Sequence, residues 1–187
     1  INKLGGTAVG NYKYYKNIYN IAISQFENKF NSNPFFVVSA INPINKDQGT
    51  TTQLINIHNK WYIYKNCCWD DMKFHEGPFK TIINSHLNLE RKLDLLYSNN
   101  YKSSEEIIEK NIIKWKNNLY SKEIKYDNFI YLGELLSANI LSGYFNKNNI
   151  KSKVIDLTDI MTNKKISISN IKNREKIIKE CGAIIPN

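Results

Sequence analysis

The stretch Phe35-Phe36-Val37-Val38-Ser39 decides the fold class of this chain. It is a continuous run of strand-forming apolar residues, the pattern of a strand buried on both faces of a parallel sheet. Upstream, Ile1-Asn2-Lys3-Leu4 reads as the end of another strand, which stops at Gly5-Gly6-Thr7. The chain therefore begins with two predicted strands that are separated by enough residues for a crossover connection.

The segment between these strands has the period of a helix. Apolar and aromatic side chains recur there at spacings of three and four, at Tyr15, Ile18, Tyr19, Ala22, Ile23 and Phe26. This spacing predicts a helix over residues 12–30, and the polar segment 31–34 with its proline ends it. Strand, helix and strand in this order predict a right-handed parallel crossover.

Further helices are expected in the rest of the chain. One follows Gly49, another covers 81–96, Ser103 and Glu106 form a capping box for a third, and Gly133-Glu134 opens a fourth. Two apolar stripes support the last two helices, the first at Ile108, Ile112, Trp115 and Leu119, the second at Leu135, Ala138, Leu141 and Phe145.

The apolar runs 153–157 and 183–185 predict two more strands of the same sheet. No internal repeat and no linker rich in Gly or Pro divides the 187 residues, which can bury one sizeable core. We therefore expect one domain of the α/β class, a three-layer α/β/α arrangement with a mainly parallel sheet. The aromatic-rich segment 60–78 is the least clear part of the pattern and is either irregular or an insertion. Its Trp and Tyr residues could form a surface for a partner protein, but we favour a helical cover over a substrate site.

Composition restricts the class of protein. Hydrophobic residues make up 42% and charged residues 23%, as in soluble globular proteins. No run approaches the roughly 20 apolar residues of a membrane span, and no signal pattern opens the chain, so a cytoplasmic protein is expected. The cysteines, the histidines and one acidic pair match no disulfide framework or metal-ligand spacing: Cys67, Cys68, Cys181, His58, His75, His86 and Asp70-Asp71.

The chain carries an excess of positive charge, because 26 Lys and Arg face 17 Asp and Glu, a formal net charge of +9. Such an excess can attract nucleic acid. The lysines are instead spread among Asn, Ile and Tyr, all encoded by AT-rich codons, so genome composition is a competing explanation. We favour composition, because no compact motif combines arginines with aromatics.

The turn after the first strand is the first candidate for chemistry, Lys3-Leu4-Gly5-Gly6-Thr7-Ala8-Val9-Gly10. Glycines let backbone amides approach an anion, and a following helix end adds partial positive charge. A lysine at a strand end can offset the charge of a phosphoryl group during transfer. An ordinary tight turn with a solvated lysine is the alternative, and these residues alone leave both open.

Four motifs, in order along the chain, resemble those of the aspartate kinases. The segment from Lys3 to Gly10 resembles the family's K-F-G-G-T-S-V-G, with Leu for Phe and Ala for Ser. Val37-Val38-Ser39-Ala40 is similar to its V-V-S-A, and Gly49-Thr50-Thr51-Thr52-Gln53-Leu54 to the G-T-T-x-x-L of fungal-type enzymes. Gly133-Glu134-Leu135-Leu136-Ser137-Ala138 resembles the G-E-x-x-S helix start, and 145–156 the helix, turn and strand that follow it. Together the motifs span nearly the whole chain.

The resemblance implies an amino-acid-kinase fold and ATP-dependent phosphorylation of the side-chain carboxylate of L-aspartate, giving 4-phospho-L-aspartate for threonine and methionine, often also lysine, biosynthesis. It implies ATP and Mg²⁺ as cofactors and a homo-oligomer at full length, without membrane or nucleic acid. Lys3 is the implied catalytic residue and binds phosphate with Gly5, Gly6 and Thr7, while the implied aspartate ligands are Ser39, Thr51 and Glu134.

Each implied ligand also has a structural interpretation. Serine and threonine at these positions are common in turns and helix caps, which applies to Ser39 and Thr51. Glu134 is the natural partner of the substrate α-ammonium, because a charge-assisted hydrogen bond fixes orientation. It could equally be a helix-start carboxylate that interacts with the helix dipole.

The resemblance assigns residues 1–187 to the N-terminal, substrate-binding part of a catalytic domain. The family's later G-R-G-G-S-D-like and T-D-G-V-like nucleotide segments are absent, as are its regulatory domains, and 183–186 resembles the strand just before them. The chain also starts without Met, and both ends look cut. We expect either an enzyme fragment that is inactive alone or a non-catalytic pseudoenzyme or interaction module of the same fold; a basic RNA-binding protein is a third, less favoured, class.

Overall fold

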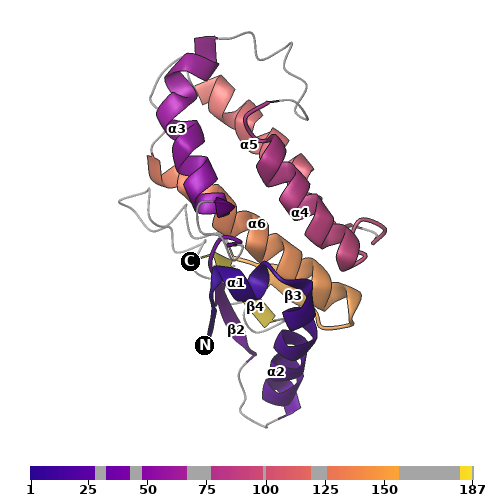
Figure 1. Cartoon of the computed structure of the whole chain (residues 1–187). Coiled ribbons are helices and arrows are strands. Elements are labelled where there is room, and N and C mark those ends of the chain that lie inside the picture. The colour runs from indigo at the N-terminus through magenta and orange to yellow at the C-terminus, as the bar shows by residue number, and fades with distance from the viewer. Residues whose placement is uncertain are drawn as a thin grey trace.

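The structure, a computed structural model, describes residues 1–27, 33–42, 48–66, 77–98, 100–118, 126–155 and 182–186. The short strands lie together, and the longer helices α3, α4 and α5 lie together in another part of the molecule (Figure 1). The elements in chain order are β1 (Asn2–Leu4), α1 (Gly6–Val9), the 3-10 helix η1 (Tyr12–Tyr14), α2 (Tyr15–Glu27), β2 (Phe35–Val38), α3 (Thr50–Asn66), α4 (Lys80–Lys92), α5 (Ser104–Asn118), α6 (Tyr126–Lys147), β3 (Ser152–Val154) and β4 (Gly182–Pro186).

The strands form one parallel sheet in the order β1-β2-β4-β3. Its register pairs Lys3 with Val37, Val37 with Ile185, and Lys153 with Ala183. The apolar runs around 35–39, 153–157 and 183–185 are therefore neighbouring strands, as predicted, except that residues 156 and 157 lie outside the described part. The expected α/β class with a parallel sheet is confirmed.

One face of the sheet is packed against helices. Leu4, Phe36, Val38 and Val154 join a core cluster with side chains of α2 and α6, and the ring of Phe36 lies 5.2 Å from that of Phe145, edge to face. Because strand side chains alternate between faces, Lys3 lies on the opposite face. Of the three expected layers, the described residues contain the sheet and this helical layer.

Helix α6 ties the sheet to a second group of helices. Its first half contributes Phe129, Leu132 and Leu136 to a separate core cluster with α3, α4 and α5. Its second half contributes Ala138, Leu141 and Phe145 to the cluster on the sheet. Figure 1 shows α6 running from the helical group to the sheet, so any site at their junction rests on one rigid element.

Two predicted helix boundaries are wrong. Gly133-Glu134 does not open a helix, because α6 begins at Tyr126 and carries Gly133 in its interior. The helix predicted over 81–96 ends at Lys92, because Asp94 adopts a left-handed conformation with φ 52°. At Gly133 a close contact with another segment overrides the glycine signal, whereas at Asp94 a left-handed residue ends the helix although the apolar pattern continues.

Other local predictions hold. The capping box forms at the start of α5, where Glu106 N donates to Ser103 Oγ at 3.3 Å and Ser103 Oγ donates to Glu106 Oε1 at 3.3 Å. Ile108, Ile112 and Trp115 are buried along that helix, while Leu119 lies outside the described residues. Among the described helices, none is long and apolar enough to cross a bilayer.

Candidate functional site

The loop after β1 is shaped by a close backbone approach at Gly6. A Cβ added there would lie 2.2 Å from the Ala40 carbonyl oxygen and 2.9 Å from Asn42 Cβ, and the Gly6 carbonyl accepts a hydrogen bond from Asn42 N at 3.1 Å. Gly5 differs, because a Cβ added at Gly5 meets no atom within 4 Å. Gly6 therefore serves packing, and Gly5 leaves open space beside the loop.

A short helix that was not predicted follows this loop, and the helix predicted over 12–30 is observed as η1 and α2, with residues 28–30 outside the described part. Helix α1 spans only Gly6–Val9 and is followed by a 3-10 turn. Four residues do not build the aligned dipole of a long helix, so the expected partial positive charge at its start is small. The lysine and the open backbone at Gly5 are the remaining features that suit an anion.

The loop after β2 lies against the first loop. Ser39 N donates to the Leu4 carbonyl at 3.1 Å, which ties the two strand ends together. Further along, Thr50 N donates to the Ile41 carbonyl at 3.0 Å, so the start of α3 is also fixed to this loop. The parallel strands thus bring the first three sequence motifs to one end of the sheet.

The fourth motif reaches the same place through Gly133. A Cβ added at Gly133 would lie 2.9 Å from Ala40 Cβ, 3.0 Å from Thr50 Cγ2 and 3.3 Å from Leu54 Cδ1. Glycine at this helical position lets α6 approach the β2 loop and α3 closely. Ala40 therefore lies in contact range of both Gly6 and Gly133, and the four motifs meet around it.

The predicted site residues differ in exposure. Lys3, Gly5, Thr7 and Thr51 are exposed, whereas Gly6, Ser39 and Glu134 are half-buried. Glu134 is in the third turn of α6, so its interpretation as a helix-start carboxylate no longer applies. Thr51 is the second residue of α3, which keeps a helix-start role for it open.

A cavity of about 450 Å³ adjoins this region, and sequence reasoning did not find it. Of the predicted site residues only Thr7 lines it; Asn42, Gln48, Ser85, Asn88 and Lys92 are among its other lining residues. Within the described part of the chain, the buried Asn42 Oδ1 accepts no hydrogen bond. The last three of those side chains lie three and four residues apart on α4, a polar stripe that could have indicated a lined hollow.

The described histidines have structural surroundings. His86 is fully buried, and its Nδ1 donates to the Ile82 carbonyl at 2.8 Å. Burial lowers the pKa of His86 to about 4, so the ring is neutral at pH 7. His58 packs edge to face on Phe129 and Tyr126, while His75 and the three cysteines lie outside the described residues.

Three solved structures of aspartate kinases are similar to the chain. The Clostridium acetobutylicum enzyme matches with a TM-score of 0.64 and 21% identity over 100% of this chain and 37% of that one. Escherichia coli aspartokinase III matches in a complex with aspartate and ADP, with a TM-score of 0.55, and in a complex with lysine and aspartate, with a TM-score of 0.54. Both share 16% identity and cover 98% of this chain and 39% of theirs.

The chain has the fold of these aspartate kinase structures. It spans about two fifths of their length. No family model and no curated protein matches the sequence. At this identity the similarity establishes the fold alone.

A pair of adjacent substitutions separates packing from function in the first loop. Gly6→Ala should lower the free energy of unfolding by about 2 kcal/mol, because the added methyl group overlaps backbone atoms of the β2 loop. Gly5→Ala should leave stability nearly unchanged, since its added methyl group meets open space. Urea unfolding of both variants measures this; equal losses would contradict the described packing of the loop.

Proposed function

We propose that the chain is the amino-acid-binding, N-terminal part of the catalytic domain of an aspartate kinase, with the nucleotide half and the regulatory domains outside it. In that role it contributes to ATP-dependent phosphorylation of the L-aspartate side-chain carboxylate. The observation that carries the proposal is the meeting of the four motifs around Ala40, through Gly6 on one side and Gly133 and Thr50 on the other. The motifs lie far apart in the sequence, and the aspartate kinase fold supports the same reading.

The proposed site residues form two groups, one that contacts the negatively charged phosphoryl group and one that contacts the amino-acid substrate. In the proposed reaction, a side-chain oxygen of aspartate attacks the terminal phosphorus of ATP, a new O–P bond forms, and the bond to ADP breaks with its electron pair leaving on ADP. Such transfer depends on positioning and charge stabilisation rather than on covalent chemistry of the protein. Lys3 offsets charge on the moving phosphoryl group, with Gly5, Gly6 and Thr7 beside it.

The amino-acid side of the site uses the other three residues. Glu134 pairs with the substrate α-ammonium, and the hydroxyl groups of Ser39 and Thr51 donate to a substrate carboxylate. The half-buried position of Glu134 on α6 favours this, because partial desolvation strengthens a charge pair.

The described residues fit a phosphate better than a metal ion. The open space at Gly5 beside the exposed Lys3 leaves room for phosphate oxygens. In contrast, the described part of the chain contains no group of three or more His, Cys, Asp or Glu side chains that could hold a metal. Mg²⁺ is commonly bound by one or two carboxylates together with substrate phosphates, so the phosphates of ATP would supply part of its ligands.

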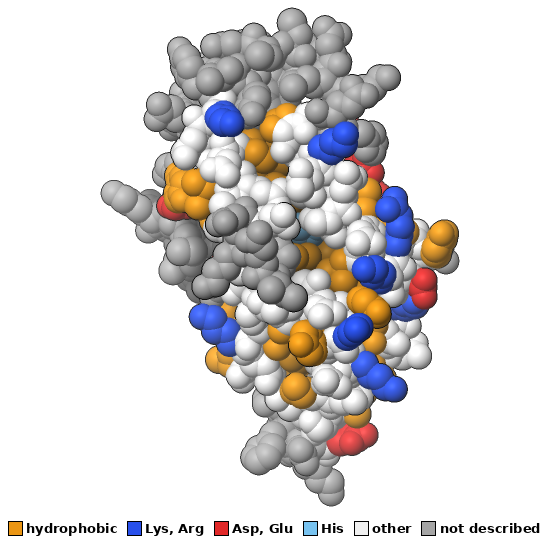
Figure 2. Space-filling model, in the orientation of Figure 1, with side chains coloured by type: hydrophobic (Ala, Val, Ile, Leu, Met, Phe, Trp, Pro, Cys, Tyr) orange, Lys and Arg blue, Asp and Glu red, His pale blue; other side chains and the backbone are white. Residues whose placement is uncertain are grey.

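The competing classes make different demands on the surface. A basic RNA-binding protein needs an organised positive patch. On the face shown in Figure 2 several Lys and Arg side chains follow one edge, but apolar and acidic side chains lie among them and they form no continuous patch. A pseudoenzyme of the same fold makes no such demand and would keep the substrate half without turnover. It is the second candidate, because a shared fold at 16–21% identity does not by itself carry catalytic activity.

Activity assays distinguish enzyme from pseudoenzyme. The 187-residue chain alone should not consume ATP in the presence of L-aspartate, whereas the protein extended through its natural reading frame should. L-Glutamate in place of L-aspartate serves as the specificity control. Robust turnover by the 187 residues alone would refute the division proposed here, and a folded but inactive extended protein would favour the pseudoenzyme.

Replacing Glu134 tests the amino-acid side of the site. In the extended protein, Glu134→Ala should raise KM for aspartate by about 30- to 150-fold, on the order of 2–3 kcal/mol, with little change in kcat. The reason is that the α-ammonium is bound equally in the ground state and the transition state. Glu109→Ala, an exposed carboxylate on α5, is the matched control and should leave KM unchanged. Loss of kcat alone would contradict the assignment.

A further inference from the structure

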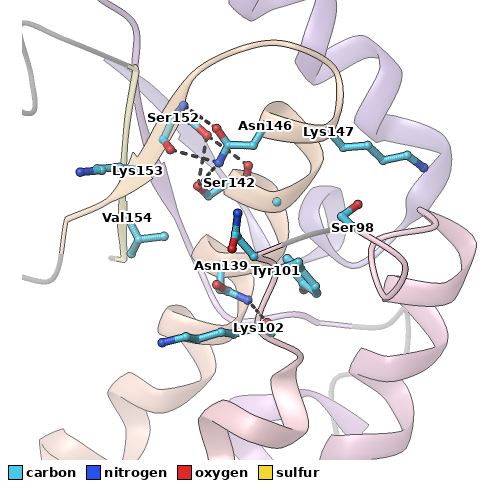
Figure 3. A pocket seen from close by; sticks show the side chains of 12 residues that line it. Ser98, Tyr101, Lys102, Asn139, Ser142, Asn146, Lys147, Ser152, Lys153 and Val154 are labelled. Atoms are coloured by element: carbon cyan, nitrogen blue, oxygen red, sulfur yellow. Dashed lines mark hydrogen bonds between the residues drawn. The ribbon is translucent and has the colours of Figure 1, made fainter.

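A second cavity, of about 560 Å³, lies away from the proposed reaction site, between the C-terminal half of α6, the start of β3 and residues 98 and 100–102 (Figure 3). Its lining combines hydroxyl, amide and ammonium groups with apolar surface such as that of Val154, and none of its lining residues is acidic. Ser98, Asn100 and Asn139 contribute neutral polar groups, and Lys102 and Lys153 contribute positive charge.

The walls of this cavity are held in place by hydrogen bonds. Asn146 Nδ2 donates to the Ser152 carbonyl at 3.1 Å, and Ser152 N donates back to Asn146 Oδ1 at 2.9 Å, which fixes the start of β3 on α6. Asn139 Nδ2 donates to the Lys102 carbonyl at 2.8 Å, which fixes the loop on the same helix. A hollow whose walls are already bonded needs little reorganisation to accept a ligand.

Tyr101 anchors the remaining wall. Its ring lies so close to α6 that a Cβ added at Gly143 would be 2.5 Å from ring carbon Cε2. Its hydroxyl donates to Glu90 Oε1 at 3.0 Å. Glu90, the acid behind this wall, is fully buried, so its carboxyl group holds the Tyr101 wall in place and is not exposed to solvent.

The three lysines of the cavity are not equivalent. Lys147 Nζ donates to the Leu93 carbonyl at 2.9 Å and lies 3.5 Å from Asp94 Oδ2, so its charge is already engaged. Lys102 and Lys153 are exposed and have no ion-pair partner among the described residues. Figure 3 shows both extending to the same side of the cavity, whereas Lys147 extends to the other side.

From this arrangement we propose that the cavity is a second binding site, for a small organic anion whose phosphate or carboxylate group meets Lys102 and Lys153 while its polar groups meet the amide and hydroxyl lining. Two ammonium groups on one side of the cavity can make charge-assisted contacts with an anion. The amides of Asn100 and Asn139 give it neutral partners. The site is independent of the proposed aspartate site, which none of its lining residues joins.

Titration of the 187-residue chain with inorganic phosphate, and separately with citrate, followed by ¹H–¹⁵N NMR, tests the proposal. The Lys3→Ala background removes the anion contact proposed in the first loop. One of the two probes should shift the resonances of Asn100, Lys102 and Lys153 with saturation, at a Kd on the order of 1 mM. The tighter probe tells whether phosphate or carboxylate is preferred.

Matched variants decide whether the cavity or net charge is responsible. Lys102→Ala/Lys153→Ala should weaken the tighter probe at least about 10-fold, whereas Lys110→Ala/Lys114→Ala, two exposed lysines on α5, should not. Lys102→Arg/Lys153→Arg should restore binding. Shifts that do not saturate, or equal losses in the two double-alanine variants, would overturn the proposal.

Discussion

Lys3→Ala should lower kcat for aspartate-dependent ATP turnover by about 10³-fold, on the order of 4 kcal/mol, with little change in KM for aspartate. Lys3 lies in β1 directly before the open loop at Gly5, and its side chain is exposed on the sheet face opposite α2 and α6. Its ammonium group is assigned to charge that develops on the phosphoryl group during transfer, so its loss affects the transition state more than the bound substrate.

The control for Lys3 is another exposed lysine. Lys16→Ala on α2 removes the same charge and should leave kcat unchanged. Lys3→Arg, which keeps the charge but changes its geometry, should retain an intermediate rate. A Lys3→Ala enzyme with unchanged kcat, or one altered only in KM for aspartate, would show that Lys3 does not act on the moving phosphoryl group.

Glu90→Ala should lower the free energy of unfolding by about 4 kcal/mol, because it leaves three buried or half-buried donors without their acceptor. Glu90 Oε1 accepts from Tyr101 Oη at 3.0 Å, from Ser104 N at 2.8 Å and from Ser104 Oγ at 2.5 Å. The carboxyl group thereby joins the end of α4 to the start of α5. Urea unfolding measures the loss, and Glu109→Ala, on the exposed side of α5, is the control.

A conservative substitution at the same position adds a pH test. Glu90→Gln keeps the acceptor and should cost much less than Glu90→Ala. Burial raises the pKa of Glu90 in the folded protein and the Glu106 charge adds to the rise, while the hydrogen bonds from Ser104 and Tyr101 oppose it. A raised folded pKa contributes stability below the unfolded value, which is lost as pH rises through the folded value.

The wild type should therefore gain stability relative to Glu90→Gln when the pH falls from 7.5 to 4.5. Contributions from the other groups, including His86 at the same buried side of α4, cancel in this difference. A difference that does not change with pH would contradict a raised pKa at Glu90. A loss below 1 kcal/mol in Glu90→Ala would contradict the hydrogen-bond network itself.

Local patterns were enough to predict most of the fold. The apolar run at β2 and the three-and-four spacing along α2 are both contained in a short stretch of sequence, so each element could be predicted without knowledge of its tertiary contacts. Helix boundaries were less predictable, since Gly133 serves contact with Ala40 and not a helix start, and a sequence does not reveal what a glycine packs against. Helix α4 ends because Asp94 adopts a left-handed backbone conformation. The apolar spacing continues past Asp94, and it therefore predicted a longer helix.

The candidate site was predictable only where residues sit in motifs. The motifs that follow predicted strands could be expected to lie close together, because the carboxyl ends of parallel strands lie at one edge of a sheet. Asn42 and Lys92 belong to no motif, and their place beside Thr7 depends on how α4 packs. The roles of Lys3, Ser39, Thr51 and Glu134 stay predictions, since geometry alone does not reveal which groups a bound aspartate meets.

The chemistry of the product tests the central claim most directly. Phosphorylation of a side-chain carboxylate yields an acyl phosphate, which hydroxylamine converts to a hydroxamate. The protein extended through its natural reading frame, supplied with ATP, Mg²⁺, L-aspartate and hydroxylamine, should accumulate aspartyl hydroxamate in step with ADP, and the Lys3→Ala variant should not. ADP formation without hydroxamate, or hydroxamate formation that Lys3→Ala leaves intact, would contradict the account.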